Sequence, residues 1–85
     1  MRQGSFLDYG MFLENVMVTA RARGLDTCPQ AAFMQFHRII AEQLGLPEGE
    51  MVVCGMSLGH ADMSRPENSL VTEREPVAAF TTWHG

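Results

Sequence analysis

The chain has 85 residues, of which 46% are hydrophobic, and a formal net charge of −4. A chain of this length forms one small domain at most and buries only about 60–65% of the surface it exposes when unfolded. Acidic residues outnumber the scattered arginines by ten to six, which argues against nucleic acid and against an anionic membrane surface as partners. No lysine is present, which excludes a Walker phosphate loop, a pyridoxal Schiff base and a lysine general base within these residues.

Residues 5–23 predict a helix. Ser5 and Asp8 have the spacing of a capping box, Arg21 suits the negative end of the helix dipole, and Gly24 can adopt the left-handed conformation that ends a helix. Apolar side chains cover nearly the whole circumference of this helix, so we expect it to be buried on most sides. An 85-residue chain cannot easily bury such a helix alone, which indicates that part of its packing surface lies elsewhere.

The next segments alternate between turns and regular structure. Residues 24–32 (GLDTCPQAA) predict a loop, and Pro29 suits the first turn of a helix that begins there or shortly after it. Residues 33–44 have the apolar spacing of an amphipathic helix, which Gly45 ends. In residues 51–58 (MVVCGMSL) both of the faces that a strand would present are apolar, which is typical of a central strand covered on both sides.

The stretch VVCGMSLGHAD admits several interpretations. Gly55 and Gly59 could form a phosphate loop, but such loops stand directly before a helix, and here a polar loop (60–69) follows. A glycine within a strand more often marks a bulge or the close approach of another group. His60 and Asp62 could bind a metal, but zinc needs three or four protein ligands, so a polar strand exit is the simpler interpretation.

Cys28 and Cys54 stand far apart with no CxxC motif, which is weak evidence for a disulfide or a metal site. Cys28 lies near a possible helix start, where the pKa of a thiol can fall, but structural roles are the better interpretation for both cysteines. No apolar stretch has the length of a signal peptide or a membrane span, so we expect a cytoplasmic protein with reduced cysteines.

The last residues, VTEREPVAAFTTWHG, predict a short strand or an arm anchored by Phe80 and Trp83. Arg74 lies between two glutamates. Such an arginine is usually a solvated surface residue, and the alternative is a phosphate ligand, because its planar fork matches phosphate oxygens.

Three segments together resemble the C-terminal portion of the flavin-dependent nitroreductase family: FLDYGMFLENVMVTARARGLDTCPQAAF, then LGLPEGEMVVCGMSLGHAD, then NSLVTEREPVAAF. The resemblance covers nearly the whole chain. It implies an α+β fold, present here as a C-terminal fragment with two helices, a buried central strand and a C-terminal arm. It also makes residues 1–85 a partial domain that lacks the family's N-terminal half, as in a truncated product, a fragment or one half of a split protein.

The resemblance further implies a function. Family members are homodimers that hold FMN at the subunit interface and transfer hydride from NADH or NADPH through the flavin to nitroaromatics, quinones or similar small-molecule acceptors. Pro29, Gln30 and Ala31 match the loop along the isoalloxazine ring, and Arg74 matches the arginine that reaches the FMN phosphate. The expected partner is a second copy or the missing N-terminal half. The alternative is a non-catalytic dimeric interaction module or an inactive fragment.

Overall fold

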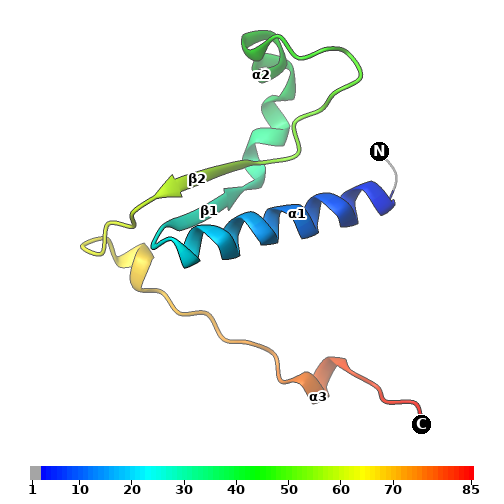
Figure 1. Ribbon diagram of the computed structural model, residues 1–85, viewed down its shortest axis with the longest axis vertical. Coiled ribbons are helices and arrows are strands. Elements are labelled where there is room, and N and C mark those ends of the chain that lie inside the picture. Colours follow the sequence, from blue (N-terminus) through cyan, green and yellow to red (C-terminus); the bar gives the residue numbers. More distant parts are fainter. Residues whose placement is uncertain (1–2) are drawn as a thin grey trace.

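The computed structural model describes residues 3–85. It is an α+β arrangement, as expected: one long helix lies along a two-stranded antiparallel sheet, and the other helices lie beyond the two ends of the sheet (Figure 1). The elements in chain order are helix α1 (Gln3–Ala22), strand β1 (Asp26–Gln30), 3-10 helix η1 (Ala31–Phe36), helix α2 (His37–Leu44), strand β2 (Gly55–Gly59), 3-10 helix η2 (Pro66–Ser69) and helix α3 (Val77–Phe80).

Helix α1 lies alongside the two-stranded ribbon (Figure 1). It already includes Gln3, so Ser5 lies inside the helix and the prediction of a capping box at Ser5 is wrong. The prediction for its other end is confirmed. Gly24 has a φ of 76°, and the backbone N–H of Leu25 donates to the carbonyl oxygen of Ala20 at 2.9 Å, which closes the last turn.

The loop predicted over residues 24–32 contains strand β1, so that prediction is wrong for Asp26–Gln30. The strand pairs with β2 in antiparallel register, from Asp26 opposite Gly59 to Gln30 opposite Gly55. Short segments rich in turn-forming residues can become strands when a distant partner supplies the pairing. Pro29 is compatible with this because each strand pairs along only one edge within residues 3–85.

Strand β2 begins at Gly55 rather than at residue 51, and its residues are half-buried or exposed. The prediction of a central strand buried on both faces therefore fails within this chain, because one neighbouring strand and one helix leave much of the ribbon open. Within residues 3–85 Ala20 is the one buried hydrophobic residue. The apolar pattern of residues 51–58 thus calls for more covering surface than the described residues supply.

The predicted helix over residues 33–44 divides into η1 and α2, because Phe36 has a non-helical conformation (φ −109°, ψ 23°). Its end at Gly45 is confirmed, with a φ of 66°. The segment after α2 returns to it: the backbone N–H of Val52 donates to Nδ1 of His37 at 3.0 Å.

The chain beyond β2 forms an arm. It turns through η2, runs extended to Pro76 and contains the short helix α3, so the tail is an arm and has no strand over residues 71–85. Figure 1 shows that η1 and α2 continue from one end of the ribbon, whereas the arm leaves from the other. Phe80 and Trp83 are exposed there.

Candidate functional site

The turn from β1 into η1 brings together three of the predicted site residues. Pro29 pairs with Met56, Gln30 pairs with Gly55, and Ala31 begins η1. All three are exposed, so their backbone and side-chain groups are open to a ligand. Gln30 is extended (φ −135°, ψ 107°) and lies at the N-terminus of η1 with no side-chain capping bond, so its amide is not used to cap the helix.

The aromatic ring of Phe33 packs against strand β2 next to this turn. The ring of Phe33, in the first turn of η1, lies directly against Gly55 of β2. A Cβ atom built on Gly55 would be less than 3.0 Å from ring atoms of Phe33, a separation that real Cβ atoms essentially never show. Gly55, the residue that pairs with Gln30, is therefore also the residue against which the Phe33 ring packs.

An open apolar hollow lies beside the turn, lined by Gln30, Ala31, Ala32, Phe33 and Phe36. Two small residues and two aromatic rings give it an apolar wall, and the Gln30 amide supplies hydrogen-bonding groups at its edge. The residues of this hollow offer apolar contacts to the face of a flat ring and hydrogen-bonding groups to a polar edge.

Arg74 does not belong to this turn in the isolated chain. It lies in the extended part of the arm, which leaves the ribbon at the end opposite to Ala31 (Figure 1). Its Nη1 donates to Oγ1 of Thr72 at 2.6 Å and to the carbonyl oxygen of Glu73 at 3.1 Å. Its other guanidinium nitrogens have no partner among residues 3–85, which leaves donors of the planar fork available to an anion.

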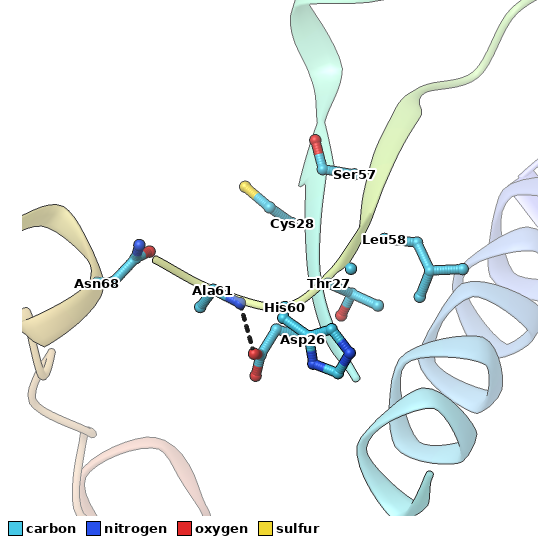
Figure 2. A pocket seen from close by; sticks show the side chains of 9 residues that line it. Asp26, Thr27, Cys28, Ser57, Leu58, His60, Ala61 and Asn68 are labelled. Carbon is cyan, nitrogen blue, oxygen red and sulfur yellow. Dashed lines mark hydrogen bonds between the residues drawn. The ribbon is translucent and has the colours of Figure 1, made fainter. Parts of the chain in front are cut away.

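A second, polar hollow lies at the other end of the ribbon (Figure 2). Its residues come from β1, β2, the following loop and η2: Asp26, Thr27, Cys28, Ser57, Leu58, Gly59, His60, Ala61 and Asn68. Figure 2 shows that the Cys28 thiol and the His60 ring point in different directions. The one drawn hydrogen bond joins the backbone N–H of Ala61 to Oδ2 of Asp26, at 2.9 Å. The groups do not converge on a common point.

The remaining candidate groups, which are the possible metal ligands, the two cysteines and Asp62, form no further site among the described residues. In the described part of the chain no three His, Cys, Asp or Glu side chains could hold one metal ion, and Cys28 and Cys54 are free thiols. Cys54 precedes β2 rather than lying in it and is half-buried. The hydroxyl and the backbone N–H of Ser64 donate to Asp62 and lower the pKa of that carboxyl. No helix among residues 3–85 is both long and apolar enough to cross a membrane.

Comparison with known proteins identifies the family of the chain. The family model "Nitroreductase family" matches residues 1–60, which is more than half of the chain. The chain belongs to the nitroreductase family. It is 47% identical over all 85 residues to a 4-nitrobenzoate reductase of Pseudomonas putida, and 47% identical over 79 residues to a nitrobenzene nitroreductase of Ectopseudomonas oleovorans.

The fold comparison agrees with the assignment to the nitroreductase family. The FMN and NADPH-dependent nitroreductase NfnB from sphigopyxis sp. strain HMH superposes with a TM-score of 0.94 at 29% identity over the whole of this chain. The chain spans 37% of the length of the Pseudomonas protein, 35% of the Ectopseudomonas protein and 38% of the NfnB chain. It therefore corresponds to less than half of each of these nitroreductases.

Reasoning from sequence did not identify the contribution of Gly55, Phe33 or Asp26. Gly55 stood out as a glycine within a strand, a pattern that suggests close approach by another group, but nothing local identified that group as the Phe33 ring. Asp26 and Arg21 are opposite charges on either side of Gly24, and that pattern could have indicated their ion pair.

Proposed function

We propose that residues 1–85 form part of a nitroreductase domain, within an FMN-dependent NAD(P)H oxidoreductase that reduces nitroaromatics, quinones or similar small-molecule acceptors. The observation that carries this proposal is the turn Pro29–Ala31 with its apolar hollow, in a chain that belongs to the nitroreductase family. The names of the relatives support the nitroaromatic substrate class, and the name of the superposed structure supports FMN and NADPH.

Each site residue has a role that its chemistry supports. When bound, FMN would supply the chemistry of hydride transfer between NAD(P)H and the acceptor. The Pro29–Ala31 backbone and the Gln30 amide bind and orient the polar edge of the ring, while the apolar hollow excludes water from its face. Arg74 binds the phosphate through a bidentate, charge-assisted pair, the strongest type of hydrogen bond that a neutral-pH side chain makes to a phosphate.

Arg74 lies far from the Pro29–Ala31 turn in the single chain, and this separation indicates that the chain needs a protein partner to bind FMN. Both groups serve one cofactor only if the arm of one chain reaches the turn of another, or if the arm is redirected by additional protein. We therefore propose that the chain acts as a homodimer or together with a protein segment equivalent to the N-terminal half of the family domain. The many exposed apolar side chains on α1 support an association of this kind. The two free thiols support a reducing, cytoplasmic environment.

The test measures flavin binding directly. The purified chain is titrated with FMN, binding is followed by the visible absorption and fluorescence of the flavin, and size-exclusion chromatography reports the species that carries the colour. We expect a yellow complex of dimer size, with Arg74→Ala weakening FMN about tenfold to a hundredfold, because a hydrogen bond to a charged group contributes about 1.5–3 kcal/mol. Riboflavin, which lacks the phosphate, is the matched control ligand. The Arg74 substitution should leave the affinity for riboflavin unchanged.

Arg38→Ala is the control variant, because Arg38 is an exposed arginine on α2 and should leave the affinity unchanged. Equal loss in both variants would show that Arg74 contributes only general positive charge. If FMN does not bind at any concentration, either to the chain alone or in the presence of protein equivalent to the N-terminal half, the flavin function is rejected and a non-catalytic interaction module is favoured.

A further inference from the structure

Gly55 differs from the other glycines of the chain in its surroundings. A Cβ atom added at any of the other seven would meet nothing within 4 Å, whereas at Gly55 it would overlap the Phe33 ring. Gly55 does not have a positive φ, so its backbone conformation is open to any residue. Glycine is therefore required here by the space that Phe33 occupies, and not by the conformation of the strand.

The register of the sheet connects this contact to the flavin-binding turn. Gly55 is paired with Gln30, and Phe33 stands three residues after Gln30 in η1. Gln30, Phe33 and Gly55 are thus linked in two ways. Gly55 pairs with Gln30 in the sheet, and the Phe33 ring, three residues after Gln30, packs against the same Gly55. Phe33 belongs to η1, whose first residue is Ala31, so the ring that packs on Gly55 and the residues of the turn lie in one short segment of the chain.

We propose that Gly55 is a positioning residue for the cofactor turn: the missing side chain at Gly55 lets Phe33 pack against β2 and so sets where Pro29, Gln30 and Ala31 meet the flavin ring. The proposal rests on the proposed flavin function. Gly55 itself need not touch the cofactor, because its effect is transmitted through Phe33. Any side chain at this position displaces the ring, and the turn moves with it.

The experiment uses Gly55→Ala in the full chain. Gly59→Ala is the matched control, since Gly59 is at the other end of the same strand, opposite Asp26, with open space around it. The third variant combines Gly55→Ala with Phe33→Ala, which removes the ring atoms that the new methyl group would meet, and is compared with Phe33→Ala alone. Amide hydrogen exchange of residues 30–33 without flavin and the dissociation constant for FMN are measured in each protein.

We expect Gly55→Ala to accelerate exchange at residues 30–33 and to weaken FMN at least tenfold. Gly59→Ala should change the FMN affinity less than twofold, and adding Gly55→Ala to Phe33→Ala should weaken FMN less than twofold further. This recovery separates a steric effect through Phe33 from a general loss of stability, because a merely destabilising substitution would cost the same in both backgrounds.

The remaining outcomes separate this proposal from the function on which it rests. Wild-type chain that binds FMN while Gly55→Ala binds it equally well would overturn the positioning role and leave the flavin function intact. Equal exchange at residues 30–33 in the Gly55 and Gly59 variants would overturn the positioning role whether or not flavin binds. Wild-type chain that binds no FMN, either alone or with protein equivalent to the N-terminal half of the family domain, would instead reject the flavin function, and with it any effect of Gly55 on the cofactor.

Discussion

Asp62 and Ser64 form a small polar turn after β2. The Ser64 hydroxyl and backbone N–H donate to Oδ1 of Asp62 at 2.6 Å and 3.0 Å. Both bonds favour the ionised carboxyl, and they hold the pKa of Asp62 below its usual value of 3.8. A carboxyl whose pKa is lower in the folded state stabilises that state above the unfolded pKa, and this stabilisation is lost as the pH falls through the folded pKa.

Replacing Ser64 tests the cause of this shift. We expect Ser64→Ala to raise the pKa of Asp62 toward 3.8, because the hydroxyl bond is its largest cause. The measurement is an NMR titration of the Asp62 side-chain carboxyl carbon between neutral pH and acid. Ser69→Ala is the control, since the Ser69 hydroxyl donates to the Pro66 carbonyl oxygen and not to Asp62. An unchanged midpoint in Ser64→Ala would assign the shift to the backbone bond instead.

At the scale of elements, Asp26 joins three parts of the fold through one carboxylate. Its Oδ1 accepts a hydrogen bond from Arg21 at the end of α1, and its Oδ2 accepts one from the backbone N–H of Ala61, just beyond β2. The side chains of Arg21 and Asp26 are 67% and 41% exposed, so solvent weakens their attraction. The bond to Ala61 is part-buried, which makes it the more valuable of the two.

We therefore expect Asp26→Ala to lower the free energy of unfolding by about 1–2 kcal/mol, chiefly because the Ala61 N–H loses its acceptor. Arg21→Gln, which removes only the ion pair, should cost less than about 1 kcal/mol. Urea denaturation followed by circular dichroism measures both values. If the two substitutions cost the same, the ion pair and not the strand exit would be the dominant contact.

The C-terminal ends of α1 and α2 could be predicted from sequence, whereas the pairing of the two strands could not. Gly24 and Gly45 carry the conformational signal for a helix end in their own chemistry, and both have the expected positive φ. Residues 26–30 have no such local signal, because DTCPQ combines turn-forming residues and becomes a strand only through pairing with β2. The start of β2 at Gly55 likewise follows from where that partner strand ends.

The candidate site shows the same division. The turn Pro29–Ala31 could be proposed from its resemblance to a family, and its position at the end of β1 agrees with a ligand-binding role. The contact between Phe33 and Gly55 could not be predicted, since it joins residues far apart in sequence and depends on the sheet register. The binding of Arg74 stays a prediction, because its arm lies apart from the turn in the single chain (Figure 1).

The whole molecule exposes more surface than a folded chain of its mass. Its accessible area is 7825 Å², whereas the scaling of folded monomers gives about 5,000 Å² for 9.4 kDa. Its radius of gyration is 16.9 Å against about 12 Å for a compact domain of this length. The excess of roughly 2,800 Å² on this one chain is larger than the roughly 800 Å² per partner that an interface of standard size buries. This exposed surface supports the proposed association with a second copy or with protein equivalent to the rest of the nitroreductase domain.

Helix α1 supplies the clearest part of this uncovered surface. Leu7 and Met11 are 68% and 59% exposed and line an apolar hollow along the helix together with Phe6 and Gly10. If a second copy covers this hollow, a carboxylate placed there must lose its hydration without gaining a partner, at a cost of several kcal/mol. We expect Leu7→Glu and Met11→Glu to shift the wild-type dimer to a smaller species.

Size-exclusion chromatography with light scattering measures this shift at equal protein concentration. Gln43→Glu adds the same charge at an exposed position on α2 and should leave the dimer intact. Dissociation by all three substitutions would indicate that net charge, rather than the α1 surface, controls association. A wild-type chain that stays monomeric and binds an apolar-surface dye strongly would show that no second copy covers α1. The covering surface would then have to come from protein equivalent to the rest of the nitroreductase domain, and the FMN titration would have to be repeated with that protein present.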